Sequence, residues 1–125
     1  MEIINYLVKD WSTDTYKSLM LGKKLLMTHT DKCILIDGTS GIVSDFPTLQ
    51  CFQEEADTRF ILHTHNACCT GYKNVLVCSP DTDVEILLLS FAHTFDGRVL
   101  FKSGSKNRPT LVDIKALQIN WNNLN

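Results

Sequence analysis

A short, almost wholly apolar run at residues 74–78 lies between two segments in which apolar residues recur at helical spacing. The first helical segment covers residues 53–68 and the second covers residues 84–93. An apolar run of this length is typical of a strand that is covered on both faces. A further strand pattern at 98–102 and a helical pattern at 111–119 follow. Because helices and strands alternate from residue 53 onward, the sequence predicts an α/β fold with a mainly parallel sheet flanked by helices.

The part of the chain before this alternation has a different pattern. Residues 24–29 and 32–36 have the composition of two strands joined by a tight turn, which predicts an N-terminal β-hairpin. Residues 1–22 are predicted to be helical. Residues 42–51 are predicted to be irregular, with Pro47 marking a connection, and residues 104–109, from Gly104 to Pro109, are predicted to form a loop.

Length and composition place the chain among ordinary globular proteins. The chain has 125 residues, of which 44% are hydrophobic and 21% charged, so we expect a single domain over 1–125 with its core in 50–119. The five cysteines show no disulfide spacing, and the start lacks the pattern of a signal peptide. We therefore expect an intracellular protein, cytoplasmic or nuclear. The longest apolar run, residues 86–89, is too short to cross a membrane.

Acidic residues cluster at two places in the predicted α/β region. Glu54, Glu55 and Asp57 open the first predicted helix, and Asp81 and Asp83 directly follow the apolar strand. Ligand sites in such sheets lie at the carboxyl ends of the strands, where a helix start and a strand end can bring carboxylates together. Crowded carboxylates repel one another, and Mg²⁺ or Mn²⁺ relieves that repulsion through oxygen ligands. The sequence therefore predicts a divalent-ion site, and helix capping by Glu54 or by Asp83 is the alternative for either cluster alone.

The two acidic motifs, with a strand between them, also resemble those of a known family. Gln-Glu-Glu-Ala-Asp-Thr-Arg followed by Ser-Pro-Asp-Thr-Asp-Val is similar to the internal region of flap-endonuclease-type nucleases of the PIN-like superfamily. Over about residues 50–115 the chain is also similar to uncharacterised animal proteins of transposon-like genes. The resemblance implies a metal-dependent nuclease that hydrolyses phosphodiester bonds with a metal-bound water. The resemblance implies that the metal ligands are Glu55, Asp57, Asp81 and Asp83, with Glu54 as an accessory acid. It also implies that the three aspartates are catalytic.

The chain departs from the pattern of that family in one respect. PIN-like nucleases take a further aspartate from the end of their first sheet strand, and only Asp37, in the predicted hairpin, stands near such a position. Asp113 is the candidate for a further acid downstream. We therefore interpret the chain as the second half of such a domain. This leaves open a non-catalytic interaction or scaffold domain that retains the nuclease fold, and a nucleotide-sugar transferase that uses Asp81-Thr82-Asp83 is a further alternative.

Basic residues toward the end of the chain suggest a nucleic-acid partner. Lys102, Lys106 and Arg108 are candidates for contacts with the phosphate backbone of DNA or RNA, and the alternative is a solvated strand end and loop. A net charge of −2 is not the basic surplus typical of such proteins. A zinc site among His63, His65, Cys68 and Cys69 has less support. Only His65 and Cys69 are spaced to share a helix face, and no second paired motif completes four ligands.

Overall fold

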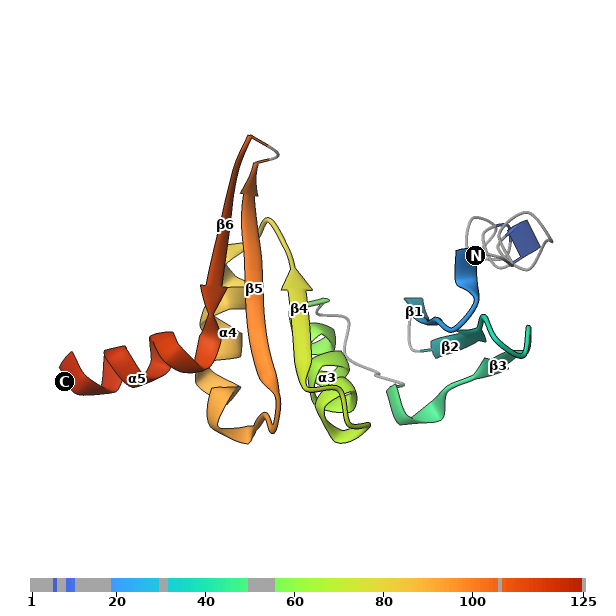
Figure 1. The fold of residues 1–125 in the computed structure, drawn as a ribbon, viewed down its shortest axis with the longest axis horizontal. Coiled ribbons are helices and arrows are strands. Elements are labelled where there is room, and N and C mark those ends of the chain that lie inside the picture. The colour runs from blue at the N-terminus through green and yellow to red at the C-terminus, as the bar shows by residue number, and fades with distance from the viewer. Residues whose placement is uncertain are drawn as a thin grey trace. The chain divides into compact units, whose positions relative to one another are not determined.

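The structure, a computed structural model, describes residues 6, 9–10, 19–29, 32–49, 56–105 and 107–124 (Figure 1). The chain divides into two compact units, Met1–Glu54 and Glu55–Asn125, and each unit contains a small sheet. The fold is therefore mixed α/β, as the alternation of patterns predicted. A single domain over 1–125 stays a prediction, and the helix predicted over 1–22 falls largely outside the described residues.

The first unit contains a three-stranded antiparallel sheet with the order β1-β2-β3. Its strands are β1 (Lys24–His29), β2 (Lys32–Asp37) and β3 (Val43–Asp45), and the 3-10 turn η1 (Pro47–Leu49) follows. β1 pairs antiparallel with β2 from Lys24 opposite Asp37 to His29 opposite Lys32, so the predicted N-terminal hairpin is confirmed.

Residues 42–51 are not wholly irregular, because β3 lies within them. The turn before β3 explains this difference. The Asp37 carboxylate accepts hydrogen bonds from the backbone N–H groups of Thr39 (2.9 Å) and Ser40 (3.3 Å), and Gly41 adopts a positive φ of 73°. The chain therefore reverses within a few residues and returns to pair with β2.

The second unit contains three helices, three strands and one short 3-10 turn among its described residues. They are α3 (Ala56–Cys69), β4 (Asn74–Cys78), α4 (Thr82–Phe91), η2 (Ala92–Thr94), β5 (Arg98–Ser105), β6 (Arg108–Asp113) and α5 (Ile114–Leu124). β4 and β5 are parallel and joined through α4, whereas β5 and β6 are antiparallel. The sheet, with the order β4-β5-β6, is therefore mixed, and its one parallel pair is the strand–helix–strand unit that the sequence predicted.

The segment after β5 folds differently from the prediction. The sequence predicts a loop at 104–109 and a helix from residue 111, but β5 continues to Ser105, β6 returns beside it and α5 begins only at Ile114. Gly104, with a φ of 91°, sits beside the tight end of this hairpin. The helical spacing of the apolar residues continues back into β6, which is why the pattern placed the start of the helix too early.

The core of the second unit lies between one face of its sheet and the helices. Val99 and Phe101 of β5 and Leu88 of α4 are fully buried there. On the opposite face, Leu76 of β4 is 55% exposed and Leu111 of β6 is 63% exposed. Among the described residues, β4 is therefore covered on one face only, and the prediction of a strand covered on both faces is wrong. In all the residues that the structure describes, no helix is both long and apolar enough to cross a membrane.

Candidate functional site

The second acidic motif forms the turn from β4 into α4. Asp81 is the N-cap of α4, and its carboxylate accepts a hydrogen bond of 2.9 Å from the backbone N–H of Asp83. The Ser79 hydroxyl oxygen in turn accepts a hydrogen bond of 3.1 Å from the backbone N–H of Asp81. Asp81 and Asp83 are both exposed just beyond the carboxyl end of β4. The cap of α4 is therefore Asp81 and not Asp83, and α4 begins two residues earlier than the sequence suggests.

The first acidic motif lies at the start of α3. Asp57 is partly buried in the first turn of this helix, and Glu54 and Glu55 lie outside the described residues. α3 and β4 run in opposite directions around a short turn, so the first turn of α3 lies toward the end of the unit at which β4 ends (Figure 1). Further along α3, the Nε of Arg59 is buried and has no hydrogen-bond partner among the described residues.

The described acids do not form a metal site by themselves. Carboxylates are suitable ligands for Mg²⁺ or Mn²⁺. Within the described residues, however, no three His, Cys, Asp or Glu side chains gather closely enough to hold an ion. The three described aspartates of the predicted site, Asp57, Asp81 and Asp83, lie toward the same end of the unit. Their side chains do not form a group close enough to coordinate one ion. The two remaining ligands that the resemblance implies belong to the segment that the structure does not describe.

The two other candidate acids stabilise local structure. Asp37 holds the turn before β3, and the hydrogen bonds from Thr39 and Ser40 lower the pKa of its carboxyl group. Asp113 lies opposite Leu100, in the half of β5 that is away from the carboxyl end of β4. Asp113 therefore does not contribute to the acidic end of this unit.

Asp113 connects β5, β6 and α5. Its carboxylate accepts a hydrogen bond of 3.2 Å from the backbone N–H of Ala116, in the first turn of α5, and one of 3.0 Å from Arg98. These two bonds lower the pKa of the Asp113 carboxyl group. The ion pair with Arg98 is largely solvated, so the helix cap is expected to contribute most of the stabilisation.

Replacing Asp113 by alanine is expected to lower the free energy of unfolding by about 1 kcal/mol at neutral pH, because the cap of α5 is lost. The pKa of Asp113 is lower in the folded chain than in the unfolded chain, so this stabilisation is complete above the unfolded value of about 3.9. It is lost as the pH falls through the folded value. Urea unfolding at pH 7 and pH 3 should show that the difference between wild type and variant narrows in acid. An equal difference in unfolding free energy between wild type and Asp113→Ala at both pH values would contradict this role of Asp113. The control is Asp96→Ala, because Asp96 lies in an exposed turn.

The described histidines and cysteines of α3 do not form a zinc site. The His65 Nε2 makes a hydrogen bond of 2.9 Å with the Thr94 hydroxyl, and the His65 ring packs against Phe95 with the ring centroids 4.7 Å apart. Cys68 is buried in the core, and Cys69 is exposed at the end of the helix. His65 and Cys69 therefore have separate roles in packing and at the surface.

A pocket of about 400 Å³ opens at the carboxyl ends of β4 and β5. We call it the β4–β5 pocket. Lys102 lies directly opposite Cys78 in the register of the two strands. The pocket is lined by Cys78, Ser79, Pro80, Lys102, Ser103, Gly104 and Pro109. It lies at the sheet edge where ligand sites of parallel α/β sheets are found, and Asp81 follows its lining residue Pro80 directly.

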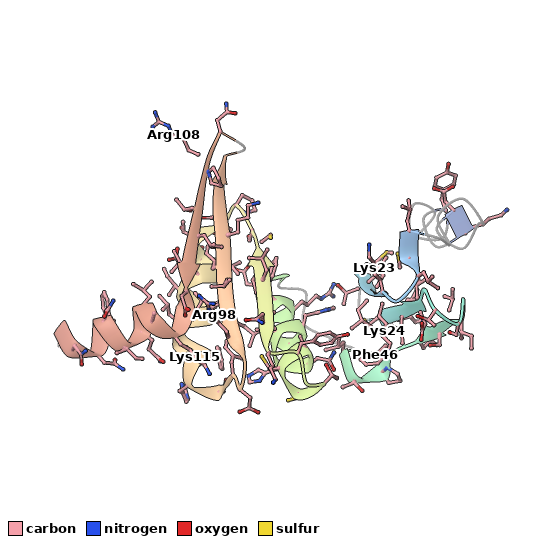
Figure 2. All side chains as sticks on the ribbon, viewed as in Figure 1. Lys23, Lys24, Phe46, Arg98, Arg108 and Lys115 are labelled. Carbon is pink, nitrogen blue, oxygen red and sulfur yellow. The ribbon has the colours of Figure 1, made fainter. Side chains whose placement is uncertain are left out.

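The basic residues of this region do not form one surface. Figure 2 shows Arg108 at the outer end of the β5–β6 hairpin, whereas Arg98 and Lys115 lie near the start of α5. Of the three predicted nucleic-acid contacts, Lys102 lines the pocket, Arg108 lies at the hairpin end and Lys106 lies outside the described residues. The sequence missed Ser103 and Pro109 as pocket residues because it did not predict that β6 would return beside β5.

Comparisons of this chain with protein-family models, with curated proteins and with solved structures found no match.

Proposed function

We propose that this chain is a nuclease-like domain that binds and hydrolyses a phosphodiester of DNA or RNA at the carboxyl ends of β4 and β5. The observation that carries this proposal is the position of three carboxylates at one end of the second unit. Asp57 opens α3 at that end, and Asp81 and Asp83 follow β4 there. In a strand–helix–strand unit with parallel strands, this is the end at which ligands bind.

The proposal includes the fold and the cofactor that the sequence motifs imply. The parallel β4–β5 pair would belong to a mainly parallel, PIN-like sheet in the complete domain. Mg²⁺ or Mn²⁺ would be the cofactor, bound by Glu55, Asp57, Asp81 and Asp83 with Glu54 as an accessory acid. The described aspartates do not complete an ion site by themselves, so the proposal assigns the two glutamates as further ligands.

A second candidate function is a non-catalytic interaction domain that keeps the nuclease fold. One observation favours it: the Asp81 carboxylate already accepts the hydrogen bond that starts α4. Such a domain would bind nucleic acid without cleaving it.

A cleavage assay combined with a binding assay separates the two candidates. The purified chain is incubated with labelled single- and double-stranded DNA and RNA, in Mn²⁺, in Mg²⁺ or in EDTA. A nuclease-like domain is expected to cleave at least one of these substrates with either ion and none in EDTA. Its melting temperature should rise steadily as the Mn²⁺ concentration increases above the Kd, since an ion present at 100 times its Kd stabilises the fold by about 2.7 kcal/mol. Binding without cleavage supports the interaction domain, and the absence of both overturns the proposal.

A further inference from the structure

The β4–β5 pocket combines one cation, one buried hydroxyl group and open space at the edge of a parallel strand pair. We propose that this pocket binds a phosphate group, with Lys102 and Ser79 as its polar contacts. The inference deepens the proposed function, on which the choice of a nucleic-acid phosphate rests. The pocket is nevertheless separate from the carboxylates, because none of its lining residues is acidic.

Lys102 is the cation of this site. Its side chain is exposed in the pocket, and no acid lies within ion-pair distance of its ammonium group among the described residues. Arg98, on the same strand, differs because it is paired with Asp113 at 3.0 Å. Lys102 therefore has its charge available for an external anion, and a phosphate oxygen is a strong acceptor for an ammonium donor.

Ser79 is the hydroxyl group of this site. The residue is only 9% exposed and lines the pocket. Its hydroxyl oxygen accepts a hydrogen bond from the backbone N–H of Asp81, which leaves the hydroxyl proton to be donated to another group. An anion in the pocket would accept this proton in a hydrogen bond.

Backbone contacts join the segments that line the pocket. The Ser79 backbone N–H donates a hydrogen bond of 3.1 Å to the Lys102 carbonyl oxygen. Gly104 has a φ of 91°, and a Cβ at this position would collide with the Arg108 carbonyl oxygen. At the start of α4, the backbone N–H of Asp83 already donates to the Asp81 carboxylate, so this N–H is not a donor to the ligand. One cation and one hydroxyl match a single phosphate group, and the volume leaves room for an attached sugar.

Affinity measurements with Lys102→Ala test the cation. The probes are inorganic phosphate and a short oligothymidylate, each titrated against the full chain without divalent ions. Loss of a charged hydrogen bond is expected to weaken binding of both probes by about tenfold or more. For the oligothymidylate, the slope of log affinity against log salt should also fall by about 1. Lys73→Ala is the matched control, because Lys73 is an exposed lysine just before the opposite end of β4.

Alkylation of Cys78 gives a second readout that needs no mutation. Cys78 is an exposed thiol that lines the pocket, whereas Cys69 is exposed at the end of α3. Saturating phosphate is expected to slow the reaction of Cys78 with iodoacetamide and to leave Cys69 unchanged, as measured by peptide mass spectrometry. Equal rates for Cys78 with and without phosphate would overturn the pocket assignment.

The outcomes separate this inference from the proposed function. If the chain binds the oligothymidylate and Lys102→Ala binds as well as Lys73→Ala, the phosphate site is wrong and the nuclease-like function stands. If phosphate binds at Lys102 but no nucleic acid binds or is cleaved, the phosphate site stands and the proposed function falls. If neither probe binds, the phosphate site is rejected.

Discussion

Replacing both Asp81 and Asp83 by asparagine is expected to reduce metal-dependent cleavage by on the order of 100-fold or more. Loss of groups that only orient metal ligands already costs about 10–100-fold, and removing two ligands should cost at least as much. Asparagine keeps the shape of aspartate and caps a helix about as well, so the hydrogen bond at the start of α4 should survive. The measurement is the cleavage rate in Mn²⁺, with circular dichroism melting to check that the fold is retained.

Asp96→Asn is the matched control for this double variant. Asp96 is an exposed acid in the turn before β5, at the opposite end of that strand from Lys102. Its replacement removes the same chemical group without touching the acidic end of the unit, so cleavage should be unchanged. Cleavage that survives in the double variant would reject Asp81 and Asp83 as metal ligands. Equal losses in the double variant and the control would instead indicate a general effect of charge.

Replacing Phe101 by alanine is expected to lower the free energy of unfolding of the second unit by about 3–5 kcal/mol. Phe101 is fully buried at the centre of β5, in the cluster that joins the sheet to α4 and α5. Its removal leaves a cavity that the surrounding strand and helices can fill only in part. A loss of this size is a large part of the stability of a small domain, so the variant should be partly unfolded at 37 °C.

Amide hydrogen exchange measures the loss of stability within the second unit itself. The backbone amides of β4 and β5 should exchange faster in Phe101→Ala than in the wild type. Leu111→Ala is the control, because Leu111 lies on the neighbouring strand but is 63% exposed, and surface substitutions usually change stability by about 0.5 kcal/mol or less. A change in Phe101→Ala no larger than that in the control would falsify the assignment of Phe101 to the core.

Much of the second unit could be predicted from the sequence, because its elements have distinct periods. The order α3, β4, α4, β5 follows from helical spacing around a short apolar run. The hairpin of β5 and β6 could not be predicted in the same way. Its residues fit a loop and a helix start equally well, and only pairing with β5, through contacts such as the 2.7 Å hydrogen bond between the hydroxyls of Ser103 and Thr110, favours the strand.

The candidate site could be predicted only in part. The sequence placed Asp81 and Asp83 beyond a strand end because a turn motif follows an apolar run, and the structure has them there. Whether the carboxylates meet depends on how helices and strands pack, which local patterns do not determine. The charge of Lys102 is visible in the sequence, but its place opposite Cys78 depends on the register of β4 and β5.

Three successive hydrogen bonds connect the pocket lysine to the acidic turn. The Ser79 N–H bonds to the Lys102 carbonyl, the Asp81 N–H bonds to the Ser79 hydroxyl, and the Asp83 N–H bonds to the Asp81 carboxylate. The acidic turn is therefore held to the backbone of β5 as well as to β4. A substitution that alters the register of these two strands is thus expected to displace the start of α4 together with the pocket.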